Sequence, residues 1–346
     1  MSADPRMDVA VVGASSLIGE AVIEEIRRSK LPVGKVLRLE ELRDIGRLAE
    51  DDESGAPALD ASSFDFSQVG LAFFCCRAQL ARSIGEAAAR QTLVIDGSGA
   101  FRDSASVPLA AADVNPQALT GVPRSEGRAH GMVALPCSAA VALATAVAPL
   151  HALAGIERLD VATYHSVSGG GRAQLEELAR ECAALLNGQE PRLRAGAERI
   201  AFNVIPQVDQ LTDGGQSLEE LRLQSEVGRL LGLPRLAVNA TAVRVPVFFG
   251  HGLAVHAQFA RELTPQAALE AWRHAPGIAL ADPGAGTGYA TPAGKSTDAD
   301  RVYVGRLRRD STRPASLNFW VVADNVRKCA AINAVSVAHI LVNRHC

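Results

Sequence analysis

One cysteine of the sequence stands at a position where a thiol becomes reactive. Cys137 directly follows Pro136 and precedes the apolar run SAAVALATAVAPL, which predicts a long helix. A thiol at the start of a helix lies near unpaired backbone amides and the positive end of the helix dipole, and both favour the thiolate. The position therefore predicts a nucleophilic cysteine, although a buried, unreactive thiol is the more common role of this residue type.

Two more candidates lie on the segment TAVRVPVFFGHG. Arg244 interrupts an apolar run, where a guanidinium needs an anionic partner, either a structural carboxylate or a ligand. His251 lies between two glycines, and imidazole is the usual general base near neutral pH, although a loop histidine is often only solvated. Arg102 follows a predicted strand, so it is either a surface charge or a group at the edge where open α/β sheets bind ligands.

The start of the chain predicts a strand, a glycine turn and a helix. The run VAVVG at 9–13 is apolar and rich in β-branched residues, and apolar residues recur at helical spacing in 19–30. Gly13 and Gly19 bound the turn GASSLIG, which lacks the usual GxGxxG spacing. Such a turn presents backbone amides at a helix N-terminus to a pyrophosphate. It therefore predicts dinucleotide binding, and a purely structural turn is the alternative.

Strands and helices then alternate along the chain. Strands predicted at 36–40, 71–76 and 92–97, with a helix at 80–90, indicate a parallel sheet with crossover helices. The acidic stretch from residue 43 to about 66 is expected to be a surface excursion.

From about residue 155 the strands become longer and partly alternating, which predicts a second α/β domain with a mixed sheet. We expect a Rossmann-type dinucleotide-binding domain over 1–132, completed by the C-terminal helix within 326–346, and a second domain over 133–325. That last helix, predicted over 326–344, is expected to pack on the first domain.

Composition restricts the class of protein. The 346 residues are 48% hydrophobic, which suffices for two domains with large cores. A formal net charge of −3 argues against a nucleic-acid partner, so we expect a small-molecule substrate. No uncharged apolar run reaches about 18 residues and the N-terminus has no leader pattern, so we expect a cytoplasmic protein without a membrane segment. The six cysteines lack metal-binding spacing, so we expect reduced thiols and no metal site.

Five segments, taken in order, resemble the aspartate-semialdehyde dehydrogenase family over nearly the whole chain. VAVVGASSLIGEAVIEEI is similar to the family's phosphate loop GATGAVG, and VIDGSGAFRDSASVPLAAADVNP is similar to VIDNSSAFR...VPEVNP. TYHSVSGGG matches TYQAVSG, and EELRLQSEVGRLL with ATAVRVPVFFGHG resembles the pair EExK...E and RVPVxxGHS. FWVVADNVRKCAAINAVSVA is similar to the terminal helix DNxRKGAALNAV. The resemblance implies a Rossmann-type domain and a second domain like the C-terminal domain of glyceraldehyde-3-phosphate dehydrogenase.

The resemblance also implies roles for the matching residues. It makes Cys137 the nucleophile, His251 the general acid/base and His165 a catalytic neighbour. The implied substrate-binding residues are Arg244 for the carboxylate, Glu219 for the ammonium group, and Arg102 and Arg222 for the phosphate. The implied cofactor-binding residues are Gly13, Ser15, Ser16, Leu17, Ile18, Gly19, Arg43, Ser168, Gly169 and Asn325.

The implied reaction is the reduction of β-aspartyl phosphate to aspartate semialdehyde with NADPH, in a homodimer formed through the second domain. Written as an oxidation, the Cys137 thiolate adds to the aldehyde and His251 removes a proton as hydride passes to the nicotinamide. Phosphate then cleaves the thioester. Two arginines at opposite ends of a short dianionic substrate would select both of its acidic groups.

The chain departs from the family pattern beside the nucleophile. Pro136 replaces an asparagine, and the loss of one oxyanion donor costs about 2.7 to 4 kcal/mol. Ser16 replaces a loop glycine, Arg222 replaces a lysine, and His165 replaces a glutamine, which adds an imidazole expected to titrate beside Cys137. The chain in this respect resembles the Usg-like relatives of the family. Two alternatives therefore stay open: a cofactor-binding relative with weak or no catalysis, and a reductase of another acyl phosphate or acyl-CoA.

The choice of cofactor depends on the end of the second strand. The family generally uses NADP, with an arginine after this strand at the 2′-phosphate, and Arg43 occupies the matching position. Glu40 and Glu41 end the strand, however, where an acid binds the free ribose diol of NAD, and Asp44 replaces a family serine. We expect NADP from the resemblance, with NAD as the alternative.

Overall fold

The structure is a computed structural model that describes residues 6–44, 58–125, 128–194, 196–281, 288–294 and 300–343. The chain divides into two compact units, which are Met1–Pro136 with Ala330–Cys346 (unit 1) and Cys137–Cys329 (unit 2). The boundaries between the two units lie after residues 136 and 329, whereas the sequence predicted boundaries after residues 132 and 325. Residues 45–57 of the expected surface excursion lie outside the described residues, and its described end contains the short strand β3 (Leu59–Asp60).

Unit 1 is built on a parallel six-stranded sheet in the order β3-β2-β1-β4-β5-β8. Its other strands are β1 (Met7–Val12), β2 (Val33–Glu40), β4 (Leu71–Phe74), β5 (Leu93–Asp96) and β8 (Gly131–Ala134). Alternate residues of β1 face opposite sides, because Val9 and Val11 join one core cluster while Ala10 and Val12 join the other. The parallel sheet expected from the sequence is confirmed.

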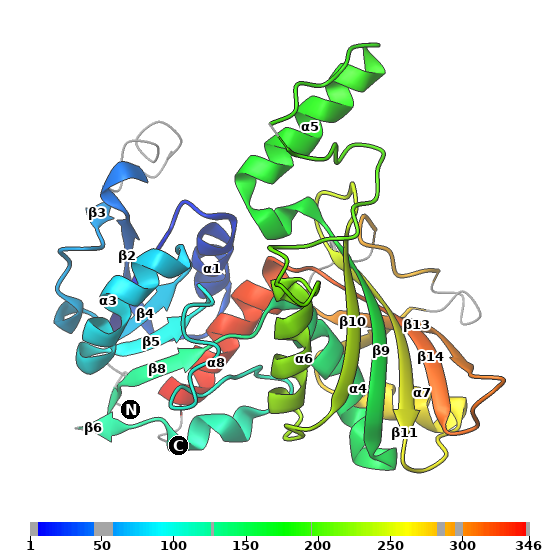
Figure 1. Cartoon of the computed structure of the whole chain (residues 1–346). Helices are drawn as coiled ribbons and strands as arrows, with labels where there is room; N and C mark the ends of the chain where they lie inside the picture. The colour runs from blue at the N-terminus through cyan, green and yellow to red at the C-terminus, as the bar shows by residue number, and fades with distance from the viewer. Residues whose placement is uncertain are drawn as a thin grey trace. The chain divides into compact units, whose positions relative to one another are not determined.

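Helices cover both faces of this sheet (Figure 1). Residues of α1 (Leu17–Arg28) and α8 (Asn333–Val342) share one core cluster, and residues of α3 (Ala78–Gln91) belong to the other. The last helix thus packs within unit 1. It is not the single regular helix expected over 326–344, because a π-helical segment (Arg327–Ile332) precedes α8. Such π-helical turns are frequent at functional sites.

Unit 2 contains a mixed six-stranded sheet in the order β10-β9-β11-β14-β13-β12. Its strands are β9 (Ile156–His165), β10 (Ala237–Arg244), β11 (His251–Phe259), β12 (Ile278–Leu280), β13 (Val302–Arg309) and β14 (Ser316–Ala323). The pairs β9-β10 and β12-β13 are parallel, and the other neighbours are antiparallel. This arrangement confirms the expected mixed sheet.

Helix α4 (Ser138–Ala154) packs on this sheet between α6 (Leu218–Leu230) and α7 (Pro265–His274) (Figure 1). The buried apolar residues of α4 lie on all sides of the helix, as expected for a helix within a core. Helix α5 (Arg172–Leu186) packs instead with a small separate cluster that includes Val167 and Leu178. None of the described helices is long and apolar enough to cross a membrane. The short elements are η1 (Leu42–Asp44), η2 (Phe66–Gln68), η3 (Pro116–Gly121), β6 (Arg124–Ser125), β7 (Arg128–Ala129) and η4 (Val167–Gly170).

The topology of unit 2 gathers polar residues at one end of its sheet. Strands β9 and β10 run in parallel and end together, because Arg244 pairs in register with His165. Strand β11 runs the opposite way and starts at this end with His251, which pairs with Ala323 at the end of β14. Asn325 lies two residues after the end of that strand. Side chains from segments far apart in the sequence therefore meet at one sheet edge.

Candidate active site

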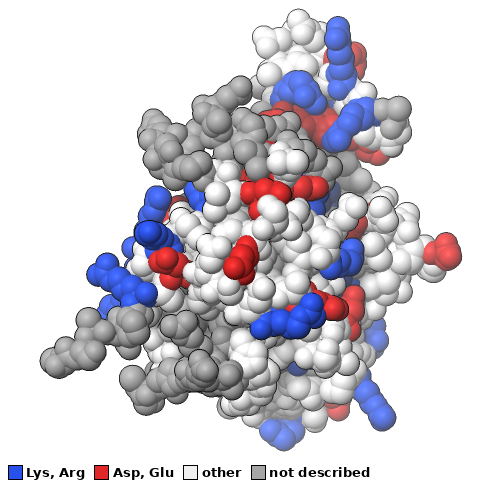
Figure 2. All heavy atoms as spheres, turned by 90° about the vertical axis from the view of Figure 1, so that its left-hand side faces the viewer, with Lys and Arg blue, Asp and Glu red and all other residues white. Residues whose placement is uncertain are grey.

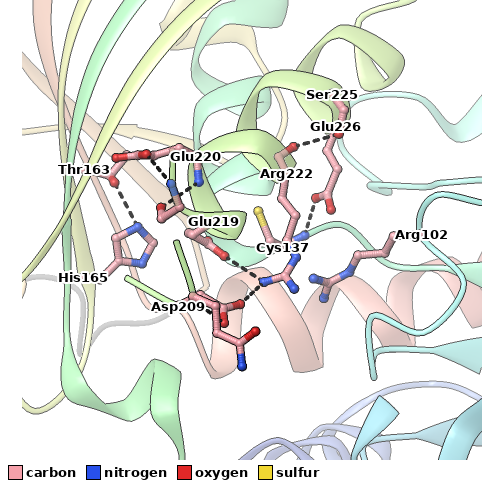
Figure 3. Close-up of polar contacts among 12 residues, drawn as sticks. Arg102, Cys137, Thr163, His165, Asp209, Glu219, Glu220, Arg222, Ser225 and Glu226 are labelled. Atoms are coloured by element: carbon pink, nitrogen blue, oxygen red, sulfur yellow. Dashed lines mark hydrogen bonds and ion pairs between the residues drawn. The ribbon is translucent and has the colours of Figure 1, made fainter. Parts of the chain in front are cut away.

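Cys137 is the residue that caps the N-terminus of α4, as its position in the sequence predicts. Its backbone is extended (φ −63°, ψ 153°), and the residue is 5% exposed. Its N–H donates to Oε2 of Glu226 on α6 at 2.6 Å (Figure 3). Pro136 carries no N–H. Neither Pro136 nor Cys137 therefore presents an amide proton to a substrate oxygen, because Pro136 has none and that of Cys137 is bound to Glu226.

The start of α4 is tied to the sheet edge through a backbone contact. Ser138, the first residue of the helix, donates its hydroxyl to the carbonyl oxygen of Asn325 at 3.0 Å. The side-chain oxygen of Asn325 accepts from the N–H of Gly250 at 3.0 Å, directly before His251. Asn325 therefore contacts both the residue after Cys137 and the residue before His251.

His251 is buried and its ring orientation is fixed by Ser166. The N–H of Ser166 donates to Nδ1 of His251 at 3.2 Å, and the Ser166 hydroxyl lies 3.1 Å from the same atom. Burial, the neighbouring His165 and the charge of Arg244 hold the pKa of His251 well below its usual value. The imidazole is therefore neutral near pH 7, and because Nδ1 accepts a backbone hydrogen bond, its proton is on Nε2.

Ser168 and Gly169, both expected at the cofactor, lie in the turn that follows β9. The hydroxyls of Ser166 and Ser168 both donate to the side-chain oxygen of Asn325, at 3.1 and 3.0 Å. A Cβ atom on Gly169 would lie 3.3 Å from Nη1 of Arg244 and 3.5 Å from the His251 ring. Glycine at this position lets the turn lie against both side chains. Ser166, which no motif argument singled out, is the centre of this network.

Arg244 points to the same turn and is largely buried. Its Nη1 donates to the carbonyl oxygen of Ser166. Burial lowers the pKa of Arg244, and the charges of Glu219 and Asp209 oppose this effect. Both carboxylates therefore lie close enough to stabilise its positive charge, as an arginine within an apolar strand requires.

Arg222 extends from α6 toward two carboxylates (Figure 3). Its Nη1 lies 2.5 Å from Oδ2 of Asp209 and 3.6 Å from Oε2 of Glu219. Burial acts to lower the pKa of Arg222, but the hydrogen bond to Asp209 and the charges of Asp209, Glu219 and Cys137 leave it raised. Arg222 and the Cys137 sulfur are thus electrostatic neighbours, and Glu219 connects Arg222 to Arg244 and His251.

Asp209 was not found by sequence reasoning. It is one of the few non-glycine residues with a positive backbone angle, at φ 68°. Such strained positions concentrate at functional sites. The stretch VDQ gives no sign of this conformation, since only the fold brings Asp209 to Arg222.

His165 corrects one expectation from the sequence. Its ring centre lies 4.4 Å from that of His251, and its Nε2 is 2.9 Å from the hydroxyl of Thr163. Burial, followed by the charge of Arg244, lowers the pKa of His165 to about 3. The expectation that this imidazole titrates beside Cys137 is therefore wrong near neutral pH, because burial keeps it uncharged.

The glycine turn of unit 1 is closely packed against the neighbouring strand ends. A Cβ on Gly13 (φ +78°) would lie 2.7 Å from the carbonyl oxygen of Cys75, and one on Gly19 would lie 2.1 Å from that of Gly13. Ser16 is the N-cap of α1 and accepts from the N–H of Gly19 at 2.9 Å. Leu17 and Ile18 open the helix, where amides have no intrahelical acceptor. These residues fit a cofactor pyrophosphate, because the turn leads directly into helix-start amides that have no intrahelical acceptor.

The remaining predicted residues of unit 1 have different surroundings. The N–H of Ser15 donates to Oε1 of Glu40 at 2.6 Å, so that carboxylate braces the turn. Arg102 donates from Nε to the carbonyl oxygen of Leu135 at 2.8 Å, near the end of unit 1. The side chain of Arg43 lies outside the described part of the chain. Among the described residues, no group of three or more histidine, cysteine, aspartate or glutamate side chains could hold a metal ion.

Comparison with known proteins places these features in context. The family model described as semialdehyde dehydrogenase, NAD binding domain, matches residues 8–122, and the model described as semialdehyde dehydrogenase, dimerisation domain, matches residues 147–328. An aspartate-semialdehyde dehydrogenase of Shewanella violacea is 35% identical, over 97% of this chain and 98% of its own length. A USG-1 protein homolog of Azotobacter vinelandii is 34% identical, over 98% and 99%.

A solved structure is similar over the same extent. The crystal structure of aspartate semialdehyde dehydrogenase II from Vibrio cholerae complexed with ASA matches with a TM-score of 0.91 at 34% identity. The match covers 99% of this chain and 100% of that one.

Proposed function

Because this chain belongs to the semialdehyde dehydrogenase family, we propose that it oxidises aspartate semialdehyde to aspartyl phosphate, with phosphate as acceptor, and catalyses the reverse reduction in biosynthesis. One observation carries the proposal. In unit 2, a cysteine at the start of a helix shares a charge cluster with Arg222, Glu219 and Arg244, beside a neutral imidazole.

This cluster matches the charges of the proposed substrate. Arg244 pairs with the substrate carboxylate, since a guanidinium binds a carboxylate through two parallel hydrogen bonds. Glu219 lies near Arg244 and receives the substrate ammonium group. Arg222, held by Asp209 beside Cys137, meets the phosphate. Arg102 of unit 1 is assigned to the phosphate from the family resemblance.

In the proposed reaction, the Cys137 sulfur is the nucleophile and the His251 ring contacts the substrate oxygen. In the oxidative direction the thiolate adds to the aldehyde carbon, and Nε2–H of His251 donates a hydrogen bond to the oxyanion that forms. The C=O bond then re-forms as the carbon of this adduct loses hydride, which leaves a thioester on Cys137. A phosphate oxygen then attacks the thioester carbon, the C–S bond breaks, and Cys137 leaves as the thiolate.

Unit 1 is proposed to hold the nicotinamide dinucleotide, which accepts or donates the hydride when bound. The glycine turn from Gly13 to Gly19 binds the pyrophosphate, and Ser168, Gly169 and Asn325 are assigned to the nicotinamide end from the resemblance. NADP is the cofactor that the resemblance implies, and NAD is the alternative. We also propose a homodimer formed through residues 147–328, which a measured mass of twice 36.3 kDa would support and a mass of 36.3 kDa would exclude.

A second function, a dinucleotide-binding relative with weak or no catalysis, is favoured by one specific observation. Pro136 has no N–H and the N–H of Cys137 is bound to Glu226, so two positions that commonly stabilise an oxyanion are not available. The identity to a USG-1 protein homolog agrees with this alternative.

A steady-state assay separates the two functions. We expect the protein to reduce the dinucleotide with aspartate semialdehyde only when phosphate is present, and we expect Cys137→Ser to lose about a thousandfold or more of this rate. Cys182→Ser, on α5, is the matched control and should keep the rate. Equal background rates in all three proteins would support the dinucleotide-binding relative and exclude the dehydrogenase.

A further inference from the structure

Three charged side chains form an ion-pair bridge in unit 1, which consists of Glu41, Asp44 and Arg77. Nη2 of Arg77 lies 2.5 Å from Oε2 of Glu41 and 2.7 Å from Oδ2 of Asp44. The arginine side chain is 56% exposed, and the two carboxylates are 29% and 26% exposed. The bridge is thus accessible to a ligand, and an exposed ion pair of this kind opens at small cost.

The bridge crosses the edge of the sheet where a dinucleotide would bind. The sheet order places β1 between β2 and β4, so the ends of these three parallel strands lie side by side. Glu41 and Asp44 directly follow β2, whereas Arg77 caps α3 just after β4. This is the topological switch point of the sheet, outside which open α/β folds bind their ligands.

Contacts of the glycine turn fix the bridge beside the phosphate loop. The hydroxyl of Ser16 donates to the carbonyl oxygen of Cys75 at 2.9 Å, and Gly13 leaves no room for a Cβ against the same group. The chain that leads to Arg77 therefore lies against the turn. A dinucleotide with its pyrophosphate on this turn would place its adenosine ribose toward the end of β2.

Glu40, at the position where an acid usually binds the ribose, is bonded to the glycine turn instead. Glu40 ends β2, but the residue is buried and its Oε1 accepts from the N–H of Ser15. Among the described side chains that follow β2, the accessible carboxylates are those of the bridge.

We infer that the ion-pair bridge of Glu41, Asp44 and Arg77 makes this protein select a dinucleotide with a free adenosine ribose, NAD, over NADP. The inference rests on the proposed dinucleotide site of unit 1 and runs against the NADP expected from family resemblance. Carboxylates accept hydrogen bonds from the two ribose hydroxyls. A 2′-phosphate, with about −1.5 to −2 charges, meets two carboxylates and an arginine whose charge they already neutralise.

Calorimetric titration with NAD⁺ and NADP⁺ tests the inference without relying on catalysis. We expect the unmodified protein to bind NAD⁺ about tenfold or more tightly than NADP⁺, since one charge-assisted contact gives a difference of this order. The double variant Glu41→Gln/Asp44→Asn removes both charges that neutralise Arg77, so its NADP⁺ affinity should rise about tenfold while NAD⁺ binding changes little.

Two further proteins complete the test. Arg77→Ala leaves the carboxylates without their cation and should weaken NADP⁺ binding more than NAD⁺ binding. Glu86→Gln removes an exposed charge of α3 outside the bridge and should leave both affinities unchanged. Tighter binding of NADP⁺ by the unmodified protein, or an unchanged affinity ratio in the double variant, would overturn the inference while keeping the dinucleotide site. Binding of neither dinucleotide would overturn both the inference and the proposed function.

Discussion

His251 and His165 lie with their ring centres 4.4 Å apart at one end of the β9-β11 pair, and both are buried. A proton on either ring would be desolvated and would lie near the other ring and Arg244, so the pKa of each is lowered. A neutral His251 with its proton on Nε2 is ready to donate to an oxyanion. This matters here because neither Pro136 nor Cys137 has an amide proton free to do so.

The low pKa of His165 predicts a loss of stability in acid. Its pKa is about 3 in the folded protein, against 6.5 for an ordinary imidazole, so the unfolded chain binds more protons between these limits. Stability is therefore fully present above pH 6.5 and falls as the pH decreases toward 3. Between about pH 7 and about pH 5, the titration of His165 alone should lower the free energy of unfolding by about 2 kcal/mol.

His165→Gln removes this titration while keeping a polar side chain that can bond to Thr163. We expect its free energy of unfolding in urea to fall less than that of the unmodified protein between those two pH values. His274→Gln, on the exposed side of α7, is the control and should retain the full acid dependence. Identical pH dependence in all three proteins would contradict the buried, uncharged state of His165.

At the level of elements, the β1–turn–α1 segment depends on a glycine inside a helix. Alanine normally stabilises a helix over glycine by about 0.5–1 kcal/mol. In Gly19→Ala, however, the new Cβ would lie 2.1 Å from the carbonyl oxygen of Gly13, so the helix must move away from the turn. We expect a loss of about 1–3 kcal/mol in stability and a loss of dinucleotide affinity.

Thermal unfolding and dinucleotide titration measure these two effects. Gly121→Ala is the matched control in unit 1, because a Cβ there would meet nothing within 4 Å. If Gly19→Ala were as stable as Gly121→Ala and bound the dinucleotide equally well, the close packing of the turn would not be required for binding.

On the scale of the whole molecule, local patterns predicted the elements but not the contacts between them. An apolar, β-branched run marked β1, helical spacing marked α1, and the apolar run after Cys137 marked α4, because each signal lies within one short segment. The bond between Cys137 and Glu226 joins residues 89 positions apart, and the ion pair of Arg77 with Glu41 joins residues 36 apart. Such pairs depend on how sheets and helices pack, which no local pattern records.

The same reason explains the two features of the site that the sequence did not reveal. Ser166 contacts both His251 and Arg244 only because β9, β10 and β11 align at one edge. Asp209 reaches Arg222 only through a backbone with φ 68°. Residue types at motif positions could therefore be assigned in advance, whereas the side chains that orient them could not.

The central claim is that Cys137 carries the acyl group between hydride transfer and phosphate attack. The most direct test is intact-protein and peptide mass measurement after mixing with aspartate semialdehyde and oxidised dinucleotide in the absence of phosphate. We predict an aspartyl adduct on the Cys137 peptide, with about one reduced dinucleotide per chain, and release of the adduct when phosphate is added. An adduct on another residue that survives Cys137→Ser, or reduced dinucleotide formed with no adduct in either protein, would contradict the account.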